Sequence, residues 1–229
     1  MQLSIRLSAI AKYVPQGSRV IDVGTDHAYI PIYLIKKGIA KSCLATDINK
    51  GPIEKARKNI LAHKIDNVKL KQTNGLEGIS EDAGEVIMIS GMGGYLIVDI
   101  LKKSRPLVEK MKKLILQPQQ DIEEVRKYLH EIGFKIEEED FVQDEEKYYT
   151  IIVAVPGKEC YDKAYEYTYG KCLIEKKLPL FKAWIMEKRS KQEKIYATLE
   201  NQDSESALQR KKELMKEIQT LKEVEMCLE

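Results

Sequence analysis

The stretch IDVGTDHAYIP, residues 21–31, places an acid and then a glycine directly after an apolar run. A strand that ends in such a turn and leads into a helix is typical of nucleotide-binding folds. A dinucleotide loop carries glycine at three spaced positions, whereas here Gly24 is followed at the second and third positions by Asp26 and Tyr29. The stretch therefore predicts a ligand-binding turn that is not built for a pyrophosphate.

Short β-type runs alternate with helical patterns around this turn. Strands are expected at 19–23, 42–48, 67–73, 85–90 and 113–117, and helices at 28–38, 51–65 and 121–133. Two more strands, 134–142 and 147–155, have no helix between them and predict a hairpin. Repeated strand–helix units predict an α/β fold with a mostly parallel, seven-stranded sheet covered on both faces and one antiparallel strand.

Pro156 and Gly157 mark an expected boundary between a domain at 1–156 and a second domain at 157–229. Beyond the boundary the β pattern ends and apolar residues recur at helical spacing, with Pro179 expected to bend or restart a helix. The segment 201–206 is expected to be a turn, since it holds good N-cap residues. A coiled-coil-like antiparallel helical hairpin accounts for this region.

The composition narrows the class of protein. Of 229 residues, 43% are hydrophobic and 32% charged, and no apolar run approaches the roughly 20 residues of a membrane span. The first residues also lack the pattern of a signal peptide, so a cytoplasmic protein with no membrane partner is expected. Four scattered cysteines and three distant histidines predict neither a disulfide framework nor a metal site.

Polar residues follow the expected strands at the edge where such sheets bind ligands. Gly24 would let a ligand approach the backbone closely, Asp47 is placed for a ribose diol, and Asn74 for an adenine edge. These contacts suit either a nicotinamide dinucleotide or S-adenosyl-L-methionine. Asp22 and Asp26 favour S-adenosyl-L-methionine, because carboxylates repel a pyrophosphate but attract a sulfonium and an ammonium group.

Several of these residues also have ordinary structural interpretations. Asp26 could cap the following helix, with or without contacting a ligand. His27 could be a structural histidine, and Gln117 a neighbour of a helix cap. The run GMGG at 91–94 could be a flexible turn, or a bare backbone that a planar ring can approach.

The chain resembles the bacterial tRNA adenine-N1 methyltransferases that act on adenine 22 of the D-arm. The resemblance rests on LSIRLSAIAKYVPQGSRVIDVGTDHAYIPIYLI, GMGG and LILQP, and it covers residues 3–155 in order. It implies a Rossmann-like class I methyltransferase domain that uses S-adenosyl-L-methionine, with tRNA as the partner. Two positions depart from the family pattern, since Asn74 stands in place of the usual Asp and Gln119 in place of an Asn.

The resemblance also implies roles for individual positions. The methionine-binding loop would hold Asp22, Gly24 and Asp26; the ribose and adenine would lie at Asp47, Ile48, Asn74 and Gly75; and the reacting centre would lie at Gly91, Met92 and Gly93. Candidate catalytic residues are Asp26, His27, Tyr29 and Gln117. Asp26 and Gln117 would accommodate positive charge on the base, whereas His27 and Tyr29 would orient or stack it.

The helical tail is locally basic, with eight Lys and Arg against three Glu in residues 171–194. Such an excess suits a phosphate backbone, although a charged helical face is often simply solvated. The candidate tRNA-binding residues are Lys171, Lys176, Lys177, Lys182, Lys188 and Arg189, with Arg6 extending the track. Two other functions stay open: methylation of another RNA site or another substrate, and non-catalytic binding of S-adenosyl-L-methionine or RNA. The protein is expected to be a monomer or a weak homo-oligomer.

Overall fold

A computed structural model describes residues 2–200, 202 and 204–229 of the chain. The fold consists of two compact units that meet in sequence between Cys160 and Tyr161. Of the turn expected at 201–206, positions 201 and 203 lie outside the described residues.

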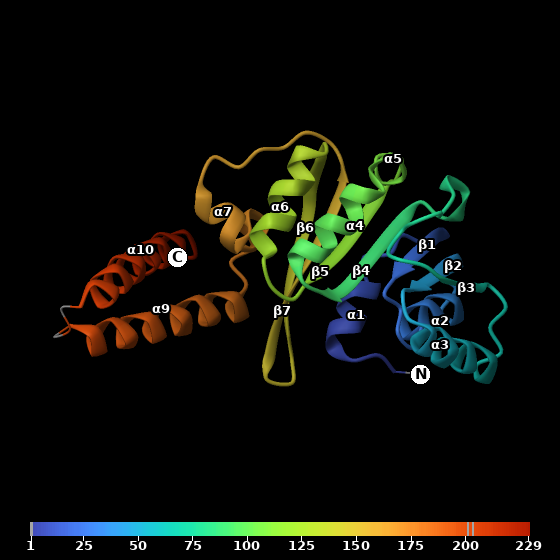
Figure 1. Cartoon of the computed structure of the whole chain (residues 1–229), viewed down its shortest axis with the longest axis horizontal. Helices are drawn as coiled ribbons and strands as arrows, with labels where there is room; N and C mark the ends of the chain where they lie inside the picture. Colours follow the sequence, from blue (N-terminus) through green and yellow to red (C-terminus); the bar gives the residue numbers. More distant parts are fainter. Residues whose placement is uncertain (1, 201, 203) are drawn as a thin grey trace. The chain divides into compact units, whose positions relative to one another are not determined.

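Among the described residues, unit 1 holds one seven-stranded sheet with the order β3-β2-β1-β4-β5-β7-β6 (Figure 1). Its strands are β1 (Ser18–Val23), β2 (Ala40–Asp47), β3 (Val68–Gln72), β4 (Val86–Met92), β5 (Lys113–Pro118), β6 (Phe134–Asp144) and β7 (Lys147–Pro156). The pairs β1–β2, β1–β4, β2–β3 and β4–β5 are parallel, while β7 runs antiparallel to both β5 and β6. The predicted mostly parallel sheet with one antiparallel strand is confirmed.

Helices cover the sheet because its central strands are apolar on both faces. The helices of unit 1 are α1 (Ile5–Ala11), α2 (Tyr29–Lys36), α3 (Lys50–Ala62), α4 (Gly94–Lys103), α5 (Arg105–Val108) and α6 (Ile122–Glu131), with a 3-10 turn η1 (Glu81–Ala83). Residues of α1, α2 and α3 share a core with Val20, Met88 and Ile115 of the sheet. The alternate residues Ile21 and Ile87 are also fully buried and therefore face the other side, where α4 and α6 pack together.

The first helix of the chain is joined to the last hairpin of the sheet. Ser4 caps α1 by accepting from the Leu7 amide. The Arg6 amide donates to the Asp144 carboxylate at 3.0 Å, and the Tyr13 hydroxyl donates to Asp140 at 3.0 Å. These bonds hold α1 against β6, so that Arg6 reaches the edge of the sheet at which the strands β1 and β4 end.

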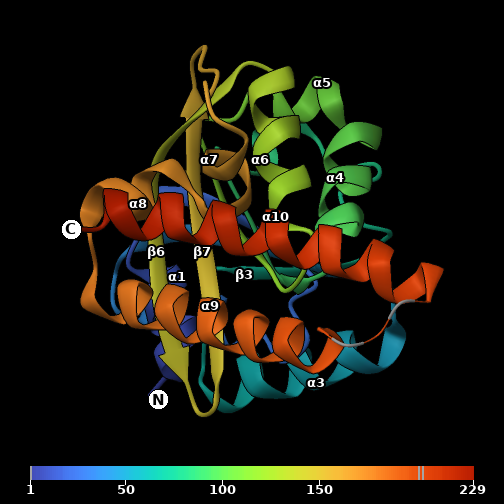
Figure 2. The ribbon, with the colours of Figure 1, turned by 90° about the vertical axis from the view of Figure 1, so that its left-hand side faces the viewer.

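Unit 2 is helical throughout its described secondary structure, with α7 (Ala164–Tyr169), α8 (Lys171–Lys176), α9 (Pro179–Leu199) and α10 (Glu205–Cys227). The helices α9 and α10 run side by side (Figure 2) and bury Phe181, Ile185, Leu214 and Leu221. Ser204 caps α10 through the Ala207 amide. The predicted helical hairpin is confirmed.

One feature of the helices differs from the sequence-based expectation, and the position of Pro179 agrees with it. A pair of short helices, α7 and α8, precedes the hairpin; Gly170, with φ of +93°, ends the first, and Lys177, with φ of +50°, ends the second. Pro179 then begins α9, where a missing amide hydrogen is tolerated. In the part of the chain that the structure describes, no helix combines the length and the apolar character that a membrane crossing requires.

Candidate active site

A pocket of about 350 Å³ opens where β1 and β4 end. Four segments form it: the helix α1, the loop from β1 into α2, the end of β4, and the residues after β5. The lining residues are Arg6, Leu7, Asp22, Gly24, Thr25, Asp26, His27, Tyr29, Ile30, Ser90, Gly91 and Gln119. The residues expected in the methionine-binding loop, Asp22, Gly24 and Asp26, therefore line one cavity. The candidate rings of His27 and Tyr29 line the same cavity.

The loop after β1 has an unusual backbone. Gly24, Asp26 and Ala28 all have positive φ, at +73°, +49° and +57°. For the two residues that carry a Cβ, this conformation costs on the order of 1 kcal/mol or more each. The loop is held by two hydrogen bonds, from the Ala28 amide to the Thr25 carbonyl and from Asn59 of α3 to the His27 carbonyl, both at 2.9 Å.

The interpretation of Asp26 as a helix cap is wrong. The helix α2 begins at Tyr29 with Ala28 as its N-cap residue, and no side chain caps it. The reason is that the left-handed turn at Ala28 separates Asp26 from the first free amides of the helix. Asp26 instead lines the pocket, with its side chain 61% exposed.

Asp26, His27 and Tyr29 form one polar wall of the pocket. The His27 ring lies parallel to the Tyr29 ring, with an interplanar angle of 4° and ring centroids 5.0 Å apart. Its Nε2 lies 3.5 Å from Asp26 Oδ2. Tyr29 remains 42% exposed. This wall offers a planar ring a stacking surface next to a carboxylate.

Asp22 is the buried acid of the pocket, at 4% exposure. Burial raises its pKa to about 6; the Thr25 side chain opposes this rise and the charge of Asp47 adds to it. The ionised carboxylate is thus destabilised by its low-polarity surroundings, and a cation placed beside it would stabilise it. Burial, together with Asp22, also raises the pKa of the Cys43 thiol, which lies in the core.

The glycines near β4 have different roles from one another. A Cβ on Gly24 would lie only 2.2 Å from Met92 Cε, so the Met92 side chain fills the space over that turn. A Cβ on Gly94 would lie 2.3 Å from the Asp121 carbonyl oxygen, and the Gly94 amide donates to the Gln120 carbonyl at 2.9 Å. The run at 91–94 is therefore a packed junction between β4 and the residues after β5. Within this run, Gly91 lines the pocket.

Gln117 lies at the end of β5 and is completely buried. Its amide nitrogen donates to the Pro118 carbonyl at 2.9 Å, and its amide oxygen accepts from Arg6 Nη1 at 2.9 Å. Gln117 is therefore not among the pocket-lining residues, and Arg6 stands between it and the cavity.

The residues expected at the ribose and adenine continue the same edge along β2 and β3. The Thr73 amide donates to the Asp47 carbonyl at 2.9 Å, and Thr46 Oγ1 donates to the Gly75 carbonyl at 3.2 Å, which ties the two strand ends together. Ile48 is 57% exposed. The Asn74 amide nitrogen donates to Glu77 at 3.0 Å, so its amide oxygen is the group suited to an adenine amino group.

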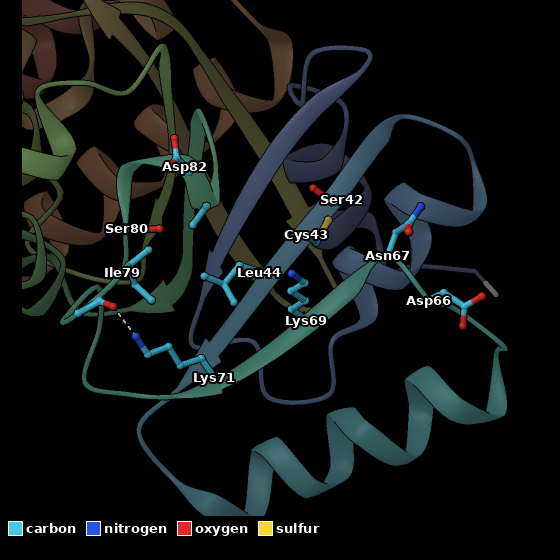
Figure 3. Close-up of a pocket in the computed structure, with 12 residues that line it drawn as sticks. Ser42, Cys43, Leu44, Asp66, Asn67, Lys69, Lys71, Ile79, Ser80 and Asp82 are labelled. Carbon is cyan, nitrogen blue, oxygen red and sulfur yellow. Dashed lines mark hydrogen bonds between the residues drawn. The ribbon is translucent and has the colours of Figure 1, made fainter.

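A second pocket, of about 530 Å³, lies over β2 and β3 beneath the segment 78–83 (Figure 3). One of the two lysines that line it, Lys71, donates to the Gly78 carbonyl and so holds that segment. None of its described lining residues belongs to the loop after β1 or to the end of β4. Across the described ranges, no group of three His, Cys, Asp or Glu is arranged to hold a metal ion.

The expected tRNA-binding cations of unit 2 differ in their surroundings. Lys188 Nζ lies 5.1 Å from the ring centroids of both Tyr169 and Trp184, and burial lowers its pKa. Arg189 pairs with Glu193 at 3.1 Å and with Glu225 of α10 at 2.8 Å. These two side chains thus stabilise the helical unit itself.

Of the other four cations, two are exposed and two are partly exposed. Lys171 Nζ lies 5.6 Å from the Tyr161 ring centroid. Lys176 and Lys177 are exposed at the end of α8, and Lys182 is partly exposed on α9.

Comparison with known proteins identifies the family that has this architecture. The family model described as "Methyltransferase domain" matches residues 3–152. The tRNA (adenine(22)-N(1))-methyltransferase of Bacillus subtilis is 30% identical, over 98% of this chain and 97% of that protein. The chain belongs to this methyltransferase family.

Solved structures of other family members have the same fold over 98% or more of this chain. A putative tRNA (m1A22) methyltransferase of Streptococcus pneumoniae in complex with S-adenosyl-L-methionine is 33% identical, with a TM-score of 0.87 over 98% of this chain and 100% of that one. TrmK of M. capricolum in complex with S-adenosyl-homocysteine is 25% identical, with a TM-score of 0.87 over 100% of both chains.

Sequence reasoning missed part of the site in this family member. Leu7 and Ile30 line the pocket, and no pattern in the sequence marked them. Arg6 was expected on an RNA-binding track but lines the pocket. Its position depends on the Gln117 and Asp144 side chains, which are 111 and 138 residues away in the sequence, and no local pattern reports such contacts.

Proposed function

We propose that this chain transfers a methyl group from S-adenosyl-L-methionine to N1 of adenine 22 in the D-arm of tRNA. The observation that carries the proposal is the acid-lined pocket at the ends of β1 and β4, in a chain that aligns over its whole length with this family. A tRNA substrate implies that the enzyme acts in the cytoplasm. Because the apolar stripes of α9 and α10 cover each other within one chain, we expect it to act as a monomer.

The residues present fit the cofactor. Its sulfonium and ammonium groups are cations, and the pocket presents the carboxylates of Asp22 and Asp26. Asp22 in particular gains from a cation, since burial raises its pKa to about 6. Asp47 and Asn74 would hold the ribose diol and the adenine at the adjoining strand ends. When bound, S-adenosyl-L-methionine supplies an electrophilic methyl group.

The chemistry asks little of the protein in proton transfer. Adenine N1 carries a lone pair, so its attack on the methyl carbon needs no base, and the product ring is cationic. The enzyme must hold the two reactants in line and stabilise the growing positive charge. The Asp26 carboxylate is suited to the charge, and the paired rings of His27 and Tyr29 are suited to stacking the adenine.

A base that takes part in tRNA structure must turn out of its stack before it can enter such a pocket. The exposed wall at Tyr29 provides a surface on which the extruded ring can rest. The basic residues of unit 2 would grip the phosphate backbone of the same tRNA. We assign this role first to Lys176 and Lys177, which are exposed, and to Lys171 and Lys182, which are partly exposed. Lys188 packs against two aromatic rings and Arg189 pairs with Glu225 of α10.

One assay tests the function as a whole. Purified protein is incubated with methyl-labelled cofactor and bulk tRNA, and the modified nucleotide is mapped. Label at N1 of adenine 22 is expected. Label at another site would replace the assigned substrate, and cofactor binding without transfer would indicate a non-catalytic module.

The role of Asp26 is tested by Asp26→Ala. Methyl transfer is expected to fall 100-fold or more, since pre-oriented charges of this kind typically contribute 10²–10³ in rate. Cofactor affinity is measured separately by calorimetry, so that a binding defect can be told from a catalytic one. Wild-type turnover in this variant would contradict the assignment. Asp66→Ala, at an exposed position that does not line the pocket at the ends of β1 and β4, is the control.

A further inference from the structure

We infer that the guanidinium of Arg6 binds the α-carboxylate of the methionine part of S-adenosyl-L-methionine, an inference that rests on the proposed function. It moves Arg6 from the RNA side of the site to the cofactor side. Four observations carry it: the position of Arg6, its orientation by neighbours, the charge balance of the pocket, and the contrast with Lys12, the C-cap residue of α1.

The position of Arg6 is defined by a buried amide. Nη1 donates to Gln117 Oε1 at 2.9 Å, and Gln117 is completely inaccessible to solvent. The Gln117 amide nitrogen is itself committed to the Pro118 carbonyl at 2.9 Å. The amide oxygen is thereby turned toward Arg6, and a buried oxygen of this kind needs a donor. The bond fixes one edge of the guanidinium and leaves its other donors for the pocket.

Two further contacts limit the motion of Arg6. The guanidinium carbon lies 5.3 Å from the centroid of the Tyr149 ring, a cation–π distance. The Arg6 backbone amide donates to Asp144 at 3.0 Å. A planar guanidinium already held in this way loses little entropy when it binds a carboxylate through two parallel hydrogen bonds.

The charges of the pocket mirror those of the cofactor. Its lining contains two carboxylates, Asp22 and Asp26, and Arg6 is the one Lys or Arg among the lining residues described. S-adenosyl-L-methionine carries two positive groups, the sulfonium and the ammonium, and one negative group, the carboxylate. Two acids and one fixed guanidinium therefore satisfy all three charges, which an acid pair alone would not do.

An RNA phosphate is the competing partner for Arg6. Lys12, the C-cap residue of α1, shows what a surface position next to this helix looks like: its side chain is 66% exposed and pairs with Asp140 at 3.5 Å. Arg6 is only partly exposed and lines the cavity. Its immediate partners are a buried amide and an aromatic ring, which favours a small ligand within the pocket over a backbone passing outside it.

The test compares two ligands that differ in the amino-acid part, which includes the carboxylate. S-adenosylhomocysteine contains the amino-acid part, whereas 5′-methylthioadenosine has the same adenosine and thioether but neither ammonium nor carboxylate. Both are titrated by calorimetry into the wild-type protein and into Arg6→Met, Arg6→Lys and Lys12→Met. The Arg6 amide that bonds to Asp144 is present in every variant, so α1 keeps that anchor.

Arg6→Met is expected to weaken S-adenosylhomocysteine binding by roughly 10- to 100-fold, the range for losing a charged hydrogen-bonded pair. Binding of 5′-methylthioadenosine is expected to stay within about twofold of wild type, which also shows that the variant is folded. Arg6→Lys keeps the charge but not the two-pronged geometry, and is expected to fall between wild type and Arg6→Met. Lys12→Met is expected to bind both ligands as wild type does.

Two outcomes would overturn the inference. Unchanged S-adenosylhomocysteine affinity in Arg6→Met, together with weaker tRNA binding, would return Arg6 to the RNA. Equal loss for both ligands would make Arg6 a support of the pocket shape. Failure of the wild-type protein to bind either ligand would instead overturn the proposed function itself, so the two failures can be told apart.

Discussion

At the scale of single residues, the decisive feature is a carboxylate held where water does not stabilise it. Asp22 closes β1 and is almost fully buried, and burial raises its pKa to about 6. In the unfolded chain an aspartate titrates near 4. Between these two values the folded protein binds more protons than the unfolded chain, so its free energy of unfolding decreases as pH rises.

Asp22→Asn is therefore expected to stabilise the ligand-free protein at pH 7.5, by up to about 2 kcal/mol. The rise of wild-type stability on acidification from pH 6.5 to 4 is expected to be smaller in the variant. Urea unfolding across this pH range measures both effects. Asp66→Asn, at an exposed position, should follow the wild-type curve, and a variant less stable than wild type at pH 7.5 would contradict the argument.

The same residue predicts how cofactor binding depends on pH. A cation is attracted only to ionised Asp22, so affinity for S-adenosylhomocysteine is expected to fall as pH drops below about 6. Asp22→Asn should bind weakly at every pH and lose this dependence. Stability and binding thus respond to this substitution in opposite directions, which calorimetry and unfolding experiments can establish on the same samples.

Much of the residue-level site could be predicted from the quoted stretch. Asp22, Gly24 and Asp26 lie within five residues of one another at the end of a strand, and strand ends are where such sheets bind ligands. The pocket confirms that they lie together. The positive φ of Ala28 could not be anticipated, because alanine rarely adopts it; packing around the fully buried side chain imposes the conformation.

At the scale of elements, the start of α4 depends on a close approach between two backbones. Gly94 packs so tightly on Gln120 and Asp121 that any Cβ would overlap a carbonyl oxygen. The same junction carries the bond from the Gln119 amide to the Met92 carbonyl at 2.8 Å. Because Gln119 lines the pocket, the packing of this junction also sets one wall of the site.

Gly94→Ala is expected to destabilise the protein by about 1–3 kcal/mol, as overpacking of a tight contact does. Gly51→Ala is the matched control: Gly51 lies in the first turn of α3 with open space around it, so alanine should be neutral or stabilising by up to about 1 kcal/mol. Urea midpoints compare the two variants. Equal stability of both would show that the junction at Gly94 can relax.

The elements themselves were predictable to the extent that a periodic pattern marked them. The runs at 85–90 and 113–117 each contain an unbroken apolar stretch, and they form the strands β4 and β5 inside the sheet. The helices α7 and α8 were not predicted, because each has only six residues, which is too short to show the spacing of apolar residues that marks a helix. Their breaks at Gly170 and Lys177 are set by backbone conformations that the sequence suggests only weakly.

At the scale of the whole molecule, the pocket and the basic helices belong to different units. Every residue that lines the pocket lies before Cys160, whereas the proposed tRNA-binding lysines follow Tyr161. Cofactor binding and tRNA binding should therefore be separable by substitutions in unit 2.

Lys177→Glu combined with Lys182→Glu is expected to weaken tRNA binding at least 10-fold at 150 mM salt, since each phosphate contact contributes through counterion release. The dependence of tRNA affinity on salt should become shallower, while S-adenosylhomocysteine affinity stays unchanged. Lys212→Glu with Lys216→Glu, on the exposed face of α10, makes the same change in charge and is the control. Equal effects of the two pairs of substitutions would indicate that the general positive charge of unit 2 attracts the tRNA, instead of a defined set of lysines.

The union of α1 with the last hairpin bears on how the domain forms during synthesis. The Arg6–Asp144 bond closes a loop of more than a hundred residues, and the entropy of such a closure must be offset by contacts that form together. A nascent chain that has emerged only as far as β4 carries the complete glycine turn yet lacks Gln117, Asp144 and Tyr149, the groups that hold Arg6. The nascent chain therefore gains its ligand affinity in one step, after the last hairpin has been made. A bound ligand would in turn stabilise the folded domain against detachment of α1.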